Sequence, residues 1–257
     1  GTDTAFAMGL IQWLLNNNGY AADYLAIPSD HAAKAANEPG HSNSTHLVIE
    51  NDDHPRADHF LRLSDLGLAE AESAADDLVV VSPAGELVAA DSLERAELFV
   101  SREVDTPNGT ILVKSSLTKL KEAADAHSME DYAKECGIPV ERIVEIAQKF
   151  AEHGRKSVAD CHGGMMSATG FYGAFAITAL NILAGSFNLR GGYIRGPAKF
   201  NGVTPGPRYD LTKFPGQRGP KGVFFSRSRF PYQKSSEFKR KQEAGQSPYP
   251  ARAPWRP

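Results

Sequence analysis

The feature that most constrains the fold is a run of helix, strand, glycine-rich loop and helix in the second half of the chain. Apolar positions in residues 140–151 follow the 3.6-residue period of a helix, and residues 156–161 predict a short strand. Residues 162–170 predict a loop, and residues 171–184 an apolar helix. In such units ligands bind at the loops that follow the strands. The sequence therefore predicts an α/β fold with a candidate ligand loop at residues 162–170.

The N-terminal segment predicts another buried helix. The residues after Asp3 are apolar around most of the helix circumference, and the sequence Asn-Asn-Asn-Gly at residues 16–19 ends the pattern. Either Thr2 or Asp3 can cap this helix by accepting a hydrogen bond from its first free backbone N–H groups.

The middle of the chain predicts a small β insertion. Residues 28–77 are polar and read as mostly loop around a short strand at residues 47–50. Two β-hairpins are predicted after them, over residues 78–90 and 96–115, with Pro and Gly in both turns. Residues 116–119 match S-x-x-K without the partner motifs of that family and predict a helix start, and Ser128 begins a capping-box sequence.

Charge divides the chain into an acidic body and a basic tail. Residues 1–195 carry a net charge of −13, and residues 196–257 carry +10 together with 10 of the 16 prolines. The basic residues are scattered, and no nucleic-acid-binding signature accompanies them, so we expect no nucleic-acid partner. We expect an extended tail that packs on its own body or on parts of a larger protein, and that is cut by protease after about Gly196.

Several other chemistries are not indicated. Two cysteines exclude a Cys₄ zinc or iron–sulfur site built from this chain alone. The five histidines in residues 31–59 lack helical metal-ligand spacing and fit a solvated polar loop. The longest strongly apolar run, residues 174–185, is shorter than the ~20 residues that span a bilayer.

The sequence His162-Gly163-Gly164 has a clear physical use. Glycines let the backbone approach a ligand closely, and their N–H groups, with the N-terminus of the following helix, favour an anion. The pattern is not G-x-G-x-x-G, so a nicotinamide dinucleotide fold is not indicated. Spacing alone leaves both a ligand loop and a purely structural turn open.

Three segments together resemble the molybdopterin oxidoreductase family of the dimethyl-sulfoxide-reductase type. They are Gly1-Thr2-Asp3 with the helix after it, the run from residue 132 to the His-Gly-Gly loop, and residues 181–192 with their two glycine-containing turns. The sequence departs from the family pattern at Thr169 and Ser186, where many relatives carry Asn.

The resemblance implies a cofactor and the residues that bind it. Members of the family hold molybdenum between two molybdopterin guanine dinucleotides (bis-molybdopterin guanine dinucleotide), with a [4Fe-4S] cluster near the N-terminus. The implied cofactor-binding residues are Thr2, Asp3, His162, Gly163, Gly164 and Gly170. No catalytic residue and no metal ligand is implied within this chain. Asp3 could accept two hydrogen bonds from the guanine edge, with simple helix capping as the alternative.

The resemblance also implies an activity. We expect the catalytic component of an enzyme that cleaves tetrathionate, a small oxyanion, to thiosulfate in anaerobic respiration, with arsenate or thiosulfate and polysulfide reduction as alternatives. Expected partners are a membrane anchor subunit that oxidises quinol and an iron–sulfur electron-transfer subunit. These partners imply a periplasmic enzyme that is associated with the membrane through them. A cofactor-free docking subunit is the competing hypothesis.

The expected organisation follows from these points. Residues 1–27 and 128–195 would form an α/β pterin-cofactor-binding domain, residues 28–127 the loop and hairpin insertion, and residues 196–257 the extended basic tail. Because Gly1 stands where an initiator Met would be, we expect this chain to be a central part of a longer protein.

Overall fold

The computed structural model describes residues 2–160, 170–193 and 236–246. Its contacts divide the chain into two compact units, Gly1–Gly196 and Pro197–Pro257. We call the first unit the body. The second unit contributes one described helix, α8 (Ser236–Glu243), which the sequence pattern did not predict.

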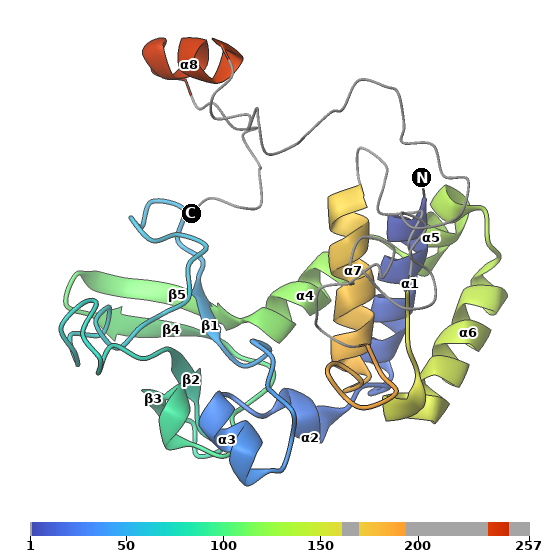
Figure 1. Cartoon of the computed structure of the whole chain (residues 1–257), viewed down its shortest axis with the longest axis horizontal. Coiled ribbons are helices and arrows are strands. Elements are labelled where there is room, and N and C mark those ends of the chain that lie inside the picture. Colours follow the sequence, from blue (N-terminus) through green and yellow to red (C-terminus); the bar gives the residue numbers. More distant parts are fainter. Residues whose placement is uncertain (1, 161–169, 194–235, 247–257) are drawn as a thin grey trace, which may run out of the picture. The chain divides into compact units, whose positions relative to one another are not determined.

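Helices hold more of the described body than strands do. The predicted N-terminal helix is confirmed as α1, the periodic helix as α6, and the apolar helix as α7 (Figure 1). The capping box at Ser128 is also confirmed, because its hydroxyl and the Asp131 carboxylate each accept a hydrogen bond from the other residue's backbone N–H. The helices are α1 (Asp3–Asn16), α2 (Ala22–Leu25), α3 (Asp30–Ala35), α4 (Ser116–Asp125), α5 (Met129–Cys136), α6 (Val140–His153) and α7 (Gly170–Leu183), with 3₁₀ turns η1 (Ala90–Ser92) and η2 (Gly154–Lys156).

Two small antiparallel sheets complete the body. Both predicted hairpins are confirmed: β2 (Val79–Val81) pairs with β3 (Leu87–Ala89), and β4 (Ser101–Thr106) pairs with β5 (Gly109–Ser115). The predicted short strand is β1 (Leu47–Ile49), which joins the other edge of β5 and gives the strand order β1-β5-β4. The fold is thus mixed helix and sheet, as expected. That the hairpins are an insertion stays a prediction.

Helices and sheets have separate cores. Helix α1 packs against α4, α5, α6 and α7, which explains why its sequence is apolar on most sides. The sheets enclose their own cluster around Ile49, Leu61 and Val113, none of which is exposed to solvent. Figure 1 shows α1, α5, α6 and α7 gathered on one side of the body and the sheets on the other, with α4 between them.

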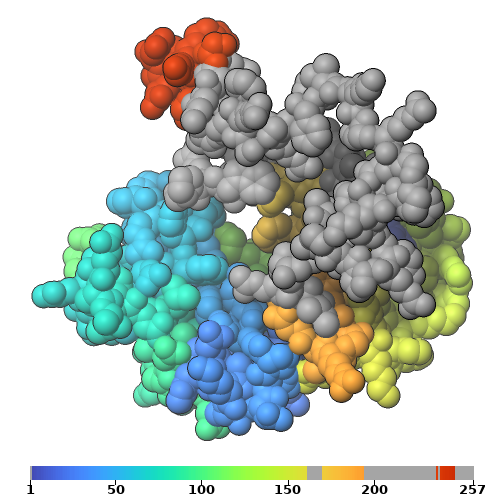
Figure 2. All heavy atoms as spheres, viewed as in Figure 1, coloured from blue at the N-terminus to red at the C-terminus, as the bar shows by residue number. Residues whose placement is uncertain are grey.

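The far end of α7 meets the α2 segment. The backbone N–H of Ala21 donates to the carbonyl of Leu183 at 2.7 Å, and Gly185 lies against Ala21 and Tyr24. In the space-filling view, the blue residues of α2 and α3 lie beside the orange residues that follow α7 (Figure 2). Within the described residues, no helix is both long and apolar enough to cross a membrane.

The strand predicted at residues 156–161 is wrong for the residues that the structure describes. Lys156 ends the turn η2, and residues 157–160 pair with no strand among the described residues. The backbone N–H and carbonyl of Ala159 are instead hydrogen-bonded to the side chain of Asn181 on α7, which supplies the partners that a neighbouring strand would. Cys161 lies outside the described residues.

Candidate functional site

The N-termini of α1 and α7 lie side by side. Both helices run in the same direction in the body (Figure 1). They approach closely because Gly173 has no side chain: a Cβ placed there would lie 3.1 Å from Thr4 Oγ1. This end of the helix pair therefore presents two sets of backbone N–H groups that have no partner within their own helix.

Two helix N-termini at one place favour a negatively charged or hydrogen-bond-accepting group. Thr2 occupies the cap position of α1, but its side chain makes no capping hydrogen bond, so the capping predicted for Thr2 is not observed. Asp3 is the first residue of α1, and its carboxylate lies in the first turn. Gly170 is the first residue of α7.

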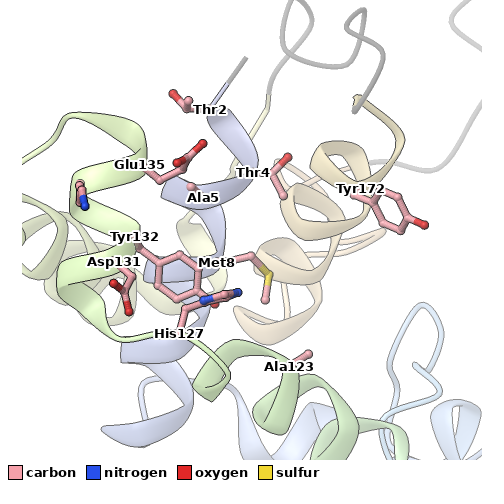
Figure 3. Close-up of a pocket in the computed structure, with 11 residues that line it drawn as sticks. Thr2, Thr4, Ala5, Met8, Ala123, His127, Asp131, Tyr132, Glu135 and Tyr172 are labelled. Atoms are coloured by element: carbon pink, nitrogen blue, oxygen red, sulfur yellow. The ribbon is translucent and has the colours of Figure 1, made fainter.

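A pocket of about 810 Å³ opens beside this end of the two helices. Figure 3 shows α1 in its centre, with α5 on one side, α7 on the other and α4, which carries Ala123, below them. Tyr132 and His127 face the pocket, whereas the Tyr172 ring projects away from Tyr132. The lining residues are Thr2, Thr4, Ala5, Met8, Ala123, His127, Asp131, Tyr132, Lys134, Glu135 and Tyr172.

Tyr132 is a fixed wall of this pocket. Its hydroxyl donates to the carbonyl of Ala124 at 2.9 Å, and its ring meets His127 edge to face with 5.8 Å between centroids. Burial raises the pKa of Tyr132, with the Asp125 carboxylate adding to the effect, so the phenol stays neutral at physiological pH. The wall therefore offers an aromatic surface and no charge.

The charged residues of the pocket lie on α5. Hydrogen bonds from the Ser128 hydroxyl and backbone N–H hold the pKa of Asp131 below its usual range, so its carboxylate is ionised and occupied as a helix cap. Lys134 and Glu135 are exposed and place one charge of each sign nearby. The pocket thus joins an apolar, aromatic interior to a polar rim, which is the usual composition of a small-molecule site.

No metal-ligand cluster is present among residues 2–160, 170–193 and 236–246, where no group of three or more His, Cys, Asp or Glu side chains could hold an ion. The described site can bind an anionic or nucleotide-like group through helix N-termini, hydroxyls and an aromatic wall. It offers no general acid–base pair that the sequence or the structure singles out.

The structure brings together the predicted cofactor-binding residues that it describes. Thr2 lines the pocket, Asp3 lies between two lining residues without lining it, and Gly170 begins the neighbouring helix. His162, Gly163 and Gly164 lie outside the described residues. Sequence reasoning missed Tyr132 and His127, because the capping box predicted α5 without showing which of its faces meets α1.

Comparison with curated proteins gives consistent relatives. The chain is 43% identical over 258 residues to the tetrathionate reductase A subunit of Salmonella typhimurium, and 34% identical over 262 residues to the tetrathionate reductase A subunit of Archaeoglobus fulgidus. It is 31% identical over 264 residues to the selenate reductase A subunit of Mesobacillus selenatarsenatis. Each alignment covers the whole chain but only 25%, 22% and 24% of these relatives, respectively. No protein-family model matches the chain.

Proposed function

We propose that this chain is part of the catalytic subunit of a molybdopterin-dependent oxidoreductase, because its resemblance to tetrathionate reductase extends over the whole chain. The chain spans about a quarter of the length of the curated relatives it matches, so the activity proposed is that of a larger protein. The proposed reaction is the reductive cleavage of tetrathionate to two thiosulfates. It consumes two electrons and breaks the central S–S bond.

One observation carries the proposal at the level of the site. Thr2 and Asp3 lie at one end of the chain and Gly170 lies far along it, yet the structure places them at the same end of two adjacent helices. The sequence resemblance independently implies a cofactor role for all three. Helix N-termini suit the pyrophosphate of a pterin guanine dinucleotide, so the described residues fit the group.

The cofactor, when bound, would supply the two-electron chemistry at molybdenum. This chain's own residues would bind and orient it. Backbone N–H groups at the start of α7 would face phosphate oxygens, and the Asp3 carboxylate would accept hydrogen bonds from the guanine edge. The [4Fe-4S] cluster expected for the family would lie on another part of the protein.

The substitution Asp3→Asn in the full-length enzyme tests this assignment. If the carboxylate accepts two hydrogen bonds from guanine, Asn loses the charge assistance and turns one acceptor into a donor that faces a donor. Charge-assisted bonds contribute ~1.5–3 kcal/mol and an unpaired buried donor costs ~1–3, which together lower cofactor retention on the order of 100-fold or more. If the Asp3 carboxylate only stabilises the first turn of α1, Asn loses a charge–dipole interaction of ~0.3–1 kcal/mol and cofactor retention is nearly unchanged.

A matched control is Asp30→Asn, which removes a carboxylate from the first turn of α3. Molybdenum and guanine nucleotide are measured per protein in both variants, and the fold is checked by circular dichroism. We expect cofactor loss in Asp3→Asn alone. Cofactor content equal to wild type in a folded Asp3→Asn protein would show that Asp3 does not hold the guanine.

The substrate is a separate proposal. Tetrathionate is named for two of the relatives and selenate for the third, so selenate is the second candidate. Arsenate, thiosulfate and polysulfide were expected as alternatives and belong in the same assay. The full-length enzyme with a reduced dye as electron donor should consume tetrathionate with the highest kcat/KM of this panel.

The proposed setting follows from the resemblance. The relatives are each named as one lettered subunit of their enzyme, which implies that they work with other subunits. We propose two partners, a membrane anchor that oxidises quinol and an iron–sulfur electron-transfer subunit, together with a periplasmic location. Cell fractionation tests the proposed location, and co-purification tests the proposed partners.

A full-length protein that holds no molybdenum and releases no fluorescent pterin would instead support a cofactor-free docking subunit.

A further inference from the structure

Helix α7 is apolar on two sides. The side that packs against α1 is buried and carries Gly173, Ala176, Ile177 and Leu180. A second stripe, with residues at intervals of three and four, consists of Tyr172, Phe175, Ala179 and Ile182. This spacing places the four residues on one side of the helix. We call this stripe the outer side of α7.

The outer side is partly open to solvent. Phe175 has 66% of its surface exposed, and Tyr172 has 55%. The Phe171 ring lies next to both, with 5.4 Å between its centroid and that of Phe175 and 5.8 Å to that of Tyr172. A helix that is apolar around its whole circumference is normally buried on every side, and clustered exposed aromatic rings are typical of contact surfaces. The outer side is therefore typical of a surface that another part of a protein covers.

The outer side borders an apolar groove. A cavity of about 230 Å³ lies where α7 meets α4 and the loop before β1, and Figure 1 shows α4 beside α7. Phe175 and Ile182 of α7 and Leu120 of α4 line it, and Asn43 and Ser44 of the loop add polar atoms. Three segments that are far apart in the sequence thus form one groove, with room for an apolar side chain of a partner.

The walls of this groove are fixed by contacts outside it. The backbone N–H of Leu117 on α4 donates to the carbonyl of Ser44 at 2.9 Å, which joins the loop to the helix. The Ser42 and Ser44 hydroxyls are buried and lie 2.7 Å apart, so they hydrogen-bond to each other. A groove with fixed walls binds a partner without the free-energy cost of ordering its own side chains.

Charge limits what can occupy the groove. None of the described residues that line it has a charged side chain. Charged partners are favoured where the opposite charge faces them, and this groove offers none. The tail, residues 196–257, carries a net charge of +10, so the groove does not match its composition. An apolar, uncharged segment matches it better.

The comparisons indicate where such a segment comes from. The chain aligns over its whole length with relatives of which it covers 25%, 22% and 24%. In a protein of that length, about three-quarters of the polypeptide lie outside the matched part. A segment of the same polypeptide is present at high effective concentration, which favours it over a separate molecule.

We propose that the outer side of α7 and its groove form an internal interface of the full-length subunit. The occupant is an apolar segment of the same polypeptide from outside these 257 residues. The proposal goes beyond the proposed function and involves no cofactor, so cofactor analysis and the experiments below can fail independently.

Photochemical cross-linking in the full-length protein identifies the occupant. Phe175 is replaced by the photoreactive amino acid p-benzoylphenylalanine, and Ile182 is replaced in the same way as a second probe on the same side. After illumination, cross-linked peptides are mapped by mass spectrometry. We expect a cross-link within one polypeptide, to an apolar segment outside the residues matched here. A cross-link to residues 196–257, to a second copy or to another subunit would overturn the proposal.

Cysteine labelling measures whether the outer side is covered at all. Phe175→Cys is compared with Glu152→Cys, which changes an exposed residue of α6, and the wild-type protein gives the background from its own cysteines. A covered thiol reacts with a water-soluble maleimide only when the interface opens, so we expect labelling of Phe175→Cys to be slower by a factor on the order of ten or more. Both variants should label equally after denaturation. Equal rates in the native protein would show that the outer side is open, and the interface would be wrong.

Discussion

Arg155 and Glu38 form a bidentate ion pair, in which Arg155 Nη1 donates to Glu38 Oε1 and Arg155 Nη2 donates to Glu38 Oε2, both at 2.6 Å. The guanidinium also lies over the Tyr24 ring, 5.8 Å from its centroid. The pair joins the turn after α6 to the segment after α3, and Glu38 is the more buried partner, with 16% of its side chain exposed against 38% for Arg155. It connects the helical part of the body to the α2–α3 segment.

Arg155→Lys should destabilise the protein by about 1 kcal/mol. Lysine keeps the charge but loses the bidentate hydrogen bonding of the guanidinium and its stacking on the Tyr24 ring. The loss is limited because the arginine is partly exposed, so solvent already screens the ion pair. Equilibrium denaturation in urea measures it. Arg142→Lys, at an exposed pair with Glu145 on α6, is the control and should change little. If both substitutions change the free energy of unfolding equally, the bidentate geometry of the Arg155–Glu38 pair contributes nothing to stability.

Gly173→Val should separate the N-termini of α1 and α7. A Cβ at this position already lies 3.1 Å from Thr4 Oγ1, and a branched side chain must displace one helix. Overpacking of this kind costs about 1–3 kcal/mol. We expect a lower melting temperature together with reduced cofactor content.

Gly173→Ala combined with Thr4→Ala is the matched comparison. The double substitution fills the glycine position but removes the hydroxyl that it would meet, so its melting temperature should stay near that of wild type. A Gly173→Val protein as stable as wild type would mean that α1 and α7 tolerate a wider separation.

Stability should fall as the pH drops below about 6.5, because of His46. Its Nε2 bonds the carbonyl of Pro28 at 2.8 Å, and Nδ1 is buried with no hydrogen-bond partner that the structure describes. Burial lowers the pKa of His46 and is the largest effect; the hydrogen bond with the Pro28 carbonyl opposes it, nearby His41 lowers the pKa further, and Asp77 raises it slightly. As the pH falls, the His46 imidazole is therefore protonated in the unfolded chain before it is protonated in the folded protein. The free energy of unfolding falls as the pH drops below the ordinary pKa of histidine.

Urea denaturation between pH 7.5 and 5 checks this. His46→Gln keeps a donor for the Pro28 carbonyl without a titrating group, so its stability should depend less steeply on pH than that of wild type. Thr45→Val alters the adjacent, fully buried residue and removes no titrating group, so it should keep the wild-type slope. Identical slopes for wild type and His46→Gln would exclude His46 as the cause.

The basic tail should be the first part of this chain that a protease cuts. Residues 196–257 contain 17 Pro and Gly residues and few periodic apolar positions, so we expect them to form no independent hydrophobic core. Limited trypsin digestion of the chain, followed by mass spectrometry, should give a stable product that ends after about Gly196. Cleavage within the body while the tail stays intact would contradict this expectation.

Local patterns in the sequence predicted most of the elements. The period of residues 140–151, the capping box at Ser128 and the glycine-containing hairpin turns each act within a few residues of the chain, and the structure confirms all three. The short helix α3 was missed, because its six residues lie in a polar stretch interrupted by Pro and Gly, where no period can be recognised.

By itself the sequence determined most of the elements, the buried helix α1 and the resemblance to a reductase family, because these depend on local order and residue type. Only the tertiary structure decided which distant groups meet. It showed that Thr4 lies against Gly173, and that the segment predicted as a strand is paired by Asn181 instead. A side chain 22 residues away satisfies the Ala159 backbone, and no pattern in the local sequence encodes that distance.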